Sequence, residues 1–358
     1  MKRIGNIYPD IYSFDNLYSA YLKARKNKRY RNEILKYSFD VGEQIINLQN
    51  ELIWYTYKPG KYRQHYVYVP KVRLIKALPF KDRVLQHAVN NIIEPIFSPP
   101  FYEYSFACRK GKGPKAASEV LTKWLYNHVI QGTELWAIKA DIRKYFDSVV
   151  LKILFSMYER KIKDKEALAL IGIILEVPTS YMAKWSSGDY ILREKGLPVG
   201  NLTSQLSANI YLTPLDNYIK EVLKPKDYIR YMDDFILLDT DKEKLKEMLR
   251  KIELFLMEEL ELELNSKTRI FPVKDGVDFV GYMHRNGYKK LKKSTWKRNK
   301  KNIKKVYLKY KEGKVTTECF RSTCSSIIGH LKHCDSYTEE TILRNFMNNA
   351  IAKYGKEG

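Results

Sequence analysis

The chain of 358 residues carries 64 Lys and Arg against 41 Asp and Glu, which gives a formal net charge of +23. Its hydrophobic share of 44% is typical of a folded soluble protein, and it has neither a bilayer-spanning apolar stretch nor an apolar signal core near the N-terminus. The positive charge predicts a polyanionic partner, and many of the 28 Tyr lie among Lys and Arg, which favours nucleic acid over a membrane.

The first third of the chain is predicted to be mainly helical, with one pair of strands. Residues 14–54 have a helical pattern with basic faces. Residues 66–75 alternate as strands on both sides of a Pro-Lys turn. An amphipathic helix is expected over 80–96, and a Gly/Lys loop at 109–114 precedes another over 116–129.

Strands and helices alternate in the middle of the chain. Residues 135–142 alternate as a strand, and residues 228–230 and 235–238 read as two short buried strands. Amphipathic helices are expected over 202–222 and 241–260. This order predicts an α+β fold in which helices cover one face of a sheet.

The last ~70 residues change in composition and are expected to form a separate lobe. Within them, the basic run 289–311 has apolar residues at helical spacing. A solvated helix face is the ordinary explanation of such a run. Because the run is single-signed in a strongly basic protein, we expect contacts with a nucleic-acid backbone. The cationic positions expected on the solvent side include Lys297, Lys300, Lys301, Lys304 and Lys305.

Tyr231-Met232-Asp233-Asp234 is the most informative stretch, because two adjacent carboxylates lie between the two short strands. A tight turn would bring both to one edge of the sheet, where a cation must neutralise them, and a divalent metal is the natural candidate. A solvated Asp-Asp hairpin turn is the alternative. Asp141 ends the strand over 135–142 and is the best third carboxylate, although alone it would be read as a helix cap.

The loop Gly196–Gln205 leads into a helix whose first turns carry small and polar residues on one side. Such a surface would allow a flat base pair to approach the backbone closely. The string is weak evidence alone, because many loops before helices have this composition.

Taken in order, these motifs resemble the palm of reverse transcriptases. The series is Asp141 with Phe146, then Gly200 to Gln205, then Tyr231 to Asp234, then Leu262 to Thr268, then Val277 to Tyr282. Upstream, the stretches 78–86 and 105–111 resemble fingers motifs of bacterial enzymes. The resemblance covers roughly residues 60–340 and implies a right-hand polymerase, with fingers over 1–135, a palm over 136–285 and a basic helical thumb over 286–358.

The aliphatic residue before Gly200 and the terminal Ser204-Gln205 resemble the diversity-generating retroelement branch. That resemblance implies error-prone copying of a template-repeat RNA at adenines and a small basic accessory variability protein. It also implies a cytoplasmic enzyme of bacterial or phage origin that uses dNTPs and holds an RNA–cDNA duplex.

Residue roles are also implied by the resemblance. Asp141, Asp233 and Asp234 would hold two Mg²⁺ ions, for which Mn²⁺ could substitute, with the Ile142 carbonyl as a further ligand. Lys267 would act as a general acid, and Phe146 would exclude a 2′-hydroxyl. The remaining expected contacts are Arg73, Arg109, Lys112, Val199, Gly200 and Gln205 with the nucleotide, and Phe279, Val280, Gly281 and Tyr282 as the primer grip.

Three alternatives stay open at this point. The chain could be a reverse transcriptase of a retron, group II intron or phage-defence system. It could also be a non-catalytic RNA-binding protein with a palm fold, although all three carboxylates and the gate aromatic are present. Finally, a Cys/His cluster over 319–334 could bind zinc, but it lacks paired C-x-x-C spacing, so helix packing is expected.

Overall fold

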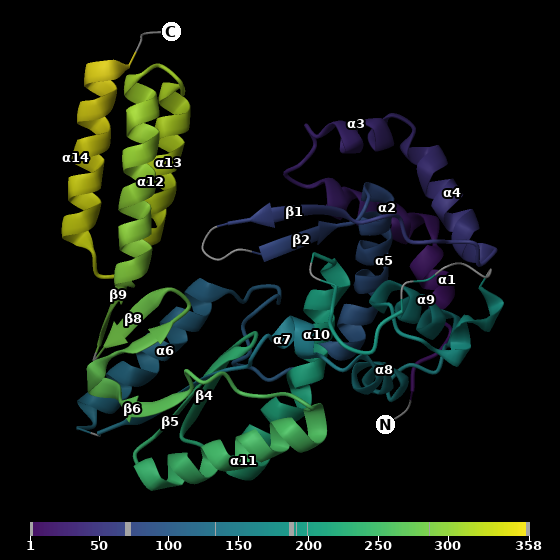
Figure 1. The fold of residues 1–358 in the computed structure, drawn as a ribbon, viewed down its shortest axis with the longest axis horizontal. Helices are drawn as coiled ribbons and strands as arrows, with labels where there is room; N and C mark the ends of the chain where they lie inside the picture. Colours follow the sequence, from purple (N-terminus) through teal and green to yellow (C-terminus); the bar gives the residue numbers. More distant parts are fainter. Residues whose placement is uncertain are drawn as a thin grey trace. The chain divides into compact units, whose positions relative to one another are not determined.

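A computed structural model shows helices and antiparallel strands in the order drawn in Figure 1. The described residues are 3–68, 73–132, 134–185, 190, 192–198, 200–285 and 287–355. Within them, no helix is both long enough and apolar enough to cross a membrane.

The chain divides into two compact units, and each is made of three separate stretches. The first unit comprises Met1–Glu103, Asp141–Lys224 and Arg250–Ser266. The second comprises Tyr104–Ala140, Pro225–Leu249 and Lys267–Gly358. The predicted α+β class is confirmed by the helices and antiparallel strands, whereas the domain boundaries at 135 and 285 stay a prediction.

The first unit is mainly helical. Its helices are α1 Tyr8–Tyr12, α2 Phe14–Arg25, α3 Asn32–Phe39, α4 Val41–Ile53, α5 Phe80–Phe97, α7 Tyr145–Ser148, α8 Leu151–Glu159, α9 Lys165–Leu175 and α10 Leu202–Asn217. Helix α5 packs against α1, α2 and α10. Its expected apolar side is buried, as Val84, Leu85 and Ala88 are each 0% exposed. Helix α10 ends earlier than the sequence pattern indicated, because Tyr218–Leu223 forms a π-helical turn after Pro214.

A β-hairpin interrupts these helices. Strand β1 Arg63–Val67 pairs antiparallel with β2 Arg73–Ala77, in a register that joins Arg63 to Ala77 and Val67 to Arg73. The expected pair of strands is thus confirmed, with β1 beginning three residues earlier than its predicted start. The Pro-Lys turn between them lies outside the described residues.

A four-stranded sheet forms the centre of the second unit. Its order is β4-β5-β3-β6, with β4 Asp227–Tyr231, β5 Asp234–Asp239, β3 Trp136–Asp141 and β6 Arg269–Pro272. Helix α6 Pro114–Ile130 packs against β4, and α11 Lys242–Leu260 follows β5. Apolar side chains of α6 and the sheet share one buried cluster that includes Leu121, Leu125, Ile229, Ile236 and Phe271.

A second sheet leads into the C-terminal helices. Its strands are β7 Val277–Phe279, β8 Tyr282–Arg285 and β9 Tyr288–Leu291. The prediction of a helix from residue 289 was therefore wrong at its start. Tyr288 to Leu291 alternate between exposed and half-buried positions and pair with β8, so the helix α12 Lys293–Lys311 begins four residues later.

The three C-terminal helices share a buried core of their own, and they are called the C-terminal lobe below. Helices α12, α13 Thr317–Leu331 and α14 Tyr337–Tyr354 run side by side (Figure 1). Ile303 and Tyr310 of α12 pack with Phe320, Cys324 and Leu343 of the other two helices. The apolar side of α12 therefore faces its neighbours, and its lysines are left on the exposed side.

The glycine at position 200 fixes the start of α10 against β2. Gly200 has φ of +111°, and a Cβ there would lie 2.1 Å from the carbonyl oxygen of Lys76. Both the dihedral and the close backbone approach exclude other residues. What approaches this loop closely is therefore a strand of the protein itself, a contact that the sequence pattern did not specify.

We predict that Gly200→Ala lowers the free energy of unfolding by more than the ~1–2 kcal/mol that positive φ alone costs, because β2 must also move. Gly42→Ala is the matched control, since Gly42 lies within α4 and a Cβ there meets nothing within 4 Å. Urea unfolding of both variants checks this. Equal stability of the two would contradict the close contact.

Candidate active site

The acidic turn is a two-residue hairpin between β4 and β5. Tyr231 pairs with Asp234, which leaves Met232 and Asp233 as the turn residues. Met232 has φ of +59°, the left-handed conformation that two-residue hairpins require and that a residue with a side chain adopts at a cost of ~1–2 kcal/mol. Both aspartates are half-buried. The structure therefore contains a strained turn at this position, and contacts with neighbouring residues must stabilise it.

Arg230 holds the turn from inside. Its side chain is 0% exposed, and its Nη1 donates a hydrogen bond of 2.9 Å to the Met232 carbonyl. On the other side of its backbone, Arg230 N donates to Tyr104 O at 3.0 Å and Arg230 O accepts from Phe106 N at 3.0 Å. The sequence pattern placed this residue in an apolar strand, so it gave no signal that a buried cation supports the acidic turn.

Lys139 supplies a cation to Asp234. Its Nζ lies 3.5 Å from Asp234 Oδ2 and also donates to the backbone carbonyl of Asp278, which belongs to β7. Lys139 projects from β3, the strand next to β5. The sequence predicts a cation beside this turn, and a metal ion was the candidate rather than a lysine. The alternation of β3, which puts Lys139 and Asp141 on one face, was the signal for this lysine.

Asp141 is fixed by Asn265. The Asn265 backbone N–H donates to Asp141 O at 2.7 Å, and its side-chain Nδ2 donates to Asp141 Oδ2 at 3.2 Å. The next residue, Ile142, is buried and forms an antiparallel bridge with Leu264. This segment clamps the end of β3 on both backbone and side chain. The motif containing Asn265 was recognised, but this role was not.

The donor chemistry of the three aspartates fits a divalent metal. Carboxylate oxygens and a backbone carbonyl are the ligands that Mg²⁺ prefers. Asp141 ends β3 and Asp234 begins β5, and these strands are neighbours in the sheet. In the part of the chain that the structure describes, however, no three His, Cys, Asp or Glu side chains are grouped closely enough to hold an ion.

The three C-terminal cysteines differ in their surroundings: Cys324 is buried, Cys334 is half-buried and Cys319 is exposed. Cys324 is 0% exposed in the core of the three-helix lobe, where burial raises the pKa of its thiol to about 11. The Cys334 thiol lies 3.4 Å from the Leu331 carbonyl. A zinc site over 319–334 has no grouped ligands among the residues described here.

Two basic residues of the fingers motif follow a segment bonded to β4. Tyr104 to Phe106 run along β4 through the hydrogen bonds of Arg230. Both basic residues follow this segment and contact it: Arg109 Nη1 donates to Ser105 O at 2.8 Å, and Lys112 Nζ lies 4.8 Å from the centre of the Phe106 ring. Both cations are therefore carried by the unit that contains the acidic turn.

Other predicted nucleotide contacts lie in the first unit. Phe146 is half-buried in α7 and packs edge-to-face on Tyr145, with ring centres 5.7 Å apart. Its carbonyl accepts a hydrogen bond of 2.7 Å from Leu197 N, so the loop before α10 is attached to α7. Gln205 is exposed on the first turn of α10. Arg73 lies in β2, and Val199 lies outside the described residues.

The predicted primer grip is a β-hairpin with a two-residue turn. Val280 and Gly281 both have positive φ, of +43° and +91°. Phe279 and Tyr282 are only 0% and 6% exposed, so their side chains serve the core. The turn backbone is what remains for contact with a ligand. Gly281 O accepts a hydrogen bond of 3.1 Å from Lys292 N, which ties this turn to the start of α12.

The remaining predicted cations are exposed. Lys267 lies in the turn that precedes β6. The five predicted lysines of α12 are all exposed, and Lys300 Nζ lies 5.6 Å from the Trp296 ring centre. The exposed residues of this row are Lys297, Lys300, Lys301, Lys304 and Lys305.

Residues 58–284 match the family described as "Reverse transcriptase (RNA-dependent DNA polymerase)". The chain belongs to this family. The match covers more than half of the chain and contains the hairpin, β3 and the Asn265 segment. The fold class is accordingly that of a right-hand polymerase, as the sequence resemblance implied.

Curated relatives include group II intron proteins. The group II intron-encoded protein LtrA of Lactococcus lactis subsp. cremoris is 27% identical over 274 residues, which cover 74% of this chain and 43% of that protein. Protein YkfC of Escherichia coli (strain K12) is 26% identical over 272 residues, covering 66% and 69%. The chain thus spans less than half the length of LtrA.

Solved structures of telomerase are also similar. The telomerase of Candida albicans, solved with a fragment of telomeric RNA, has a TM-score of 0.46 and 14% identity, and the match covers 87% of this chain and 62% of that one.

We predict that Asn265→Ala weakens Mg²⁺ binding by about 10–100-fold, because groups that orient a metal-binding carboxylate have effects of this size. The variant loses the side-chain bond to Asp141 and keeps the backbone bond. Calorimetric titration with Mg²⁺ measures the change, and Asn302→Ala, an exposed asparagine of α12, is the control. Unchanged affinity in Asn265→Ala would show that the side-chain bond of Asn265 does not orient a metal ligand.

Proposed function

We propose that this protein is an RNA-directed DNA polymerase that extends a primer 3′ end with dNTPs on an RNA template. The observation that carries the proposal is the acidic hairpin turn, supported by a buried arginine, within a chain of the reverse transcriptase family. The net charge of +23 supports a nucleic-acid partner.

Asp141, Asp233 and Asp234, with the Ile142 carbonyl, would hold two Mg²⁺ ions, for which Mn²⁺ could substitute. Ions at such a site lower the pKa of the attacking hydroxyl and stabilise the departing pyrophosphate. Lys139, which contacts Asp234 at 3.5 Å, balances part of the negative charge of the turn. It would need to release that carboxylate when a cation of higher charge is bound.

Other residues would position the substrates. Arg109 and Lys112 would bind the triphosphate, since a guanidinium fork and an ammonium both match phosphate oxygens. Phe146 would occupy the space of a 2′-hydroxyl, and Lys267 would give a proton to pyrophosphate. The backbone of the turn at Val280 and Gly281 would support the primer. Arg73 and Gln205 would complete the nucleotide and base-pair contacts.

The domain assignment belongs to the same proposal. Residues 1–135 would be fingers, 136–285 the palm and 286–358 the thumb, with an RNA–cDNA duplex against the lysines of α12. The separate core of α12 to α14 supports a distinct thumb. The exposed row of lysines supports backbone contacts with the duplex.

We further propose the diversity-generating class, in which a template-repeat RNA is copied with errors at adenines and a small basic accessory protein assists. The support is local: the aliphatic Val199 before Gly200, and Gln205 after Ser204. A reverse transcriptase of a group II intron is the second candidate, and the similarity to LtrA favours it. A near-duplicate repeat pair in the neighbouring DNA, differing at adenines, would decide for the first.

We predict that Asp233→Asn abolishes primer extension on an RNA template while RNA binding is retained, because the substitution removes a metal ligand and leaves the basic surfaces intact. Asp275→Asn, at an exposed aspartate outside the site, is the control. Extension by Asp233→Asn well above background would remove the basis of the proposed activity.

Neutralising Lys300, Lys301, Lys304 and Lys305 is expected to flatten the salt dependence of duplex binding, by up to about one unit of log–log slope for each lost phosphate contact. The control combines Lys246→Ala and Lys314→Ala, whose cations already pair with Glu243 and Glu312. Fluorescence anisotropy across a salt series gives both slopes. If the α12 variant keeps the wild-type slope, these lysines form an ordinary solvated face.

The fidelity prediction concerns the loop before α10. Val199→Gln, alone or with Gln205→Pro, is expected to lower errors opposite template adenine more than errors opposite other bases. The expected change is one to two orders of magnitude, because one added polar contact is worth ~1–3 kcal/mol in the competition between right and wrong pairs. Sequencing of cDNA made by the wild type and both variants measures this. An unchanged adenine error rate would reject the diversity-generating role of this loop.

A further inference from the structure

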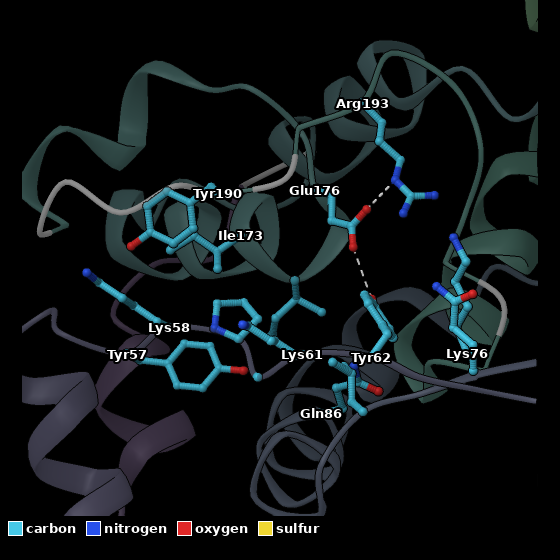
Figure 2. A pocket seen from close by; sticks show the side chains of 15 residues that line it. Tyr57, Lys58, Lys61, Tyr62, Lys76, Gln86, Ile173, Glu176, Tyr190 and Arg193 are labelled. Atoms are coloured by element: carbon cyan, nitrogen blue, oxygen red, sulfur yellow. Dashed lines mark hydrogen bonds and ion pairs between the residues drawn. The ribbon is translucent and has the colours of Figure 1, made fainter.

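A cavity of about 550 Å³ lies wholly within the first unit. None of the residues that line it has a proposed catalytic or substrate-binding role, and only Lys76, whose backbone lies against Gly200, was described above. Its walls come from the segment before β1, from β2 and α5, and from the end of α9 with the loop that follows (Figure 2). Ile173 and Ile174 of α9 give it an apolar floor. The volume is large enough for one nucleotide.

The lining combines aromatic rings with cations. Tyr57 and Tyr190 lie on one side in Figure 2, near Lys58, and Lys76 and Arg193 lie on the other. Lys58 is exposed at the rim, whereas Lys76 is half-buried. Rings beside solvent-facing ammonium groups match a ligand that has a flat base and a phosphate.

One buried carboxylate lies in the wall and is held by fixed partners. Glu176 is 6% exposed; its Oε1 accepts a 3.0 Å hydrogen bond from the Tyr62 hydroxyl, and its Oε2 pairs with Arg193. Burial and the neighbouring Glu176 raise the pKa of Tyr62, so its hydroxyl stays protonated and donates. A carboxylate has about four lone-pair positions, so Glu176 can accept further bonds from a base edge.

The same network reaches the start of α10. Asn201 Nδ2 donates to the Tyr62 hydroxyl at 3.1 Å, and Leu202 N donates to Gln86 Oε1 at 2.8 Å. Asn201 is 3% exposed, and its Oδ1 has no hydrogen-bond partner among the described atoms. Two residues of the cavity wall, Tyr62 and Gln86, therefore set the position of the helix that is proposed to line the nascent base pair.

We propose that this cavity takes one unpaired nucleotide of the template RNA ahead of the copying site, with its base against Tyr57, Tyr190 and Glu176 and its phosphate at Lys58 and Lys61. This inference rests on the proposed polymerase function and adds a template site to it. Through Tyr62 and Asn201, an occupied cavity would hold the start of α10 in place while the next base pair forms.

The charge of the wall favours a template nucleotide over a free triphosphate. A nucleoside triphosphate inside the cavity would bring several negative charges close to Glu176, and like charges at short range repel. A template nucleotide brings one charge per phosphate, and that charge stays at the rim, where Lys58 and Lys61 are exposed. The neutral base is then the only part that enters.

The test uses the full chain bound to primer–template duplexes whose single-stranded RNA overhang grows from none to eight nucleotides. Anisotropy gives the dissociation constant for each length, and 2-aminopurine placed at each overhang position reports stacking. We expect affinity to rise by about tenfold at one overhang length, the size of a single base–aromatic stack, with fluorescence quenched at that same position.

Three variants and one control separate the contributions. Tyr190→Ala is expected to remove the quenching and the affinity step, and the double variant of Lys58→Ala with Lys61→Ala is expected to reduce the step. Tyr62→Phe keeps the ring and loses both hydroxyl bonds, so it is expected to keep the step and to slow extension. Lys152→Ala, an exposed lysine of α8 outside the cavity, should behave as the wild type.

Several results would overturn the inference. The first is a smooth rise of affinity with overhang length, and the second is an affinity step that survives in Tyr190→Ala. The third is a raised KM for dNTPs in the cavity variants with no change in overhang binding. That last result would make the cavity a free-nucleotide site. Overhang binding is measured without catalysis. A protein that binds the overhang stepwise but never extends a primer would therefore contradict the polymerase proposal and leave this one standing.

Discussion

The site depends first on how the strained acidic turn between β4 and β5 is held in place. Two adjacent carboxylates repel each other, and Met232 adopts a backbone conformation that side chains disfavour. Arg230 stabilises the turn with a buried positive charge and a hydrogen bond to the Met232 carbonyl. Its backbone is hydrogen-bonded to the segment Tyr104 to Phe106. Because Arg109 donates a hydrogen bond to the Ser105 carbonyl of that segment, Arg230 also couples the acidic turn to a basic loop.

The second element of charge balance is Lys139. A lysine 3.5 Å from one aspartate lowers the electrostatic cost of keeping that aspartate half-buried. The same ammonium group bonds the backbone of β7, and Asp278 of β7 pairs with Lys292 at the start of α12. A row of alternating charges thus runs from the acidic turn to the C-terminal lobe, and each member has a partner of opposite charge or a carbonyl.

Much of this fold could be predicted because its signals are local. Periodicity defined α5 and α6 closely, and the alternation of β3 and the two apolar runs around the acidic turn identified three strands of the sheet. The features that were missed depend on long-range contacts. Arg230 is buried because distant segments surround it, Asn265 matters only where its strand segment meets Asp141, and Tyr288 to Leu291 form a strand because β8 offers an edge. A basic composition alone could not distinguish that strand from the helix after it.

The attachment of Lys292 has a mechanical consequence. This residue bonds the turn at Gly281 through its backbone and Asp278 through its side chain, and it is also the cap of α12. The start of the C-terminal lobe is therefore attached to the second sheet by two contacts of Lys292. A tilt of α12 to α14 must either bend the chain after residue 292 or displace the turn at Gly281. A force applied to α12 would therefore be transmitted through Lys292 to the backbone at Gly281 and to the side chain of Asp278.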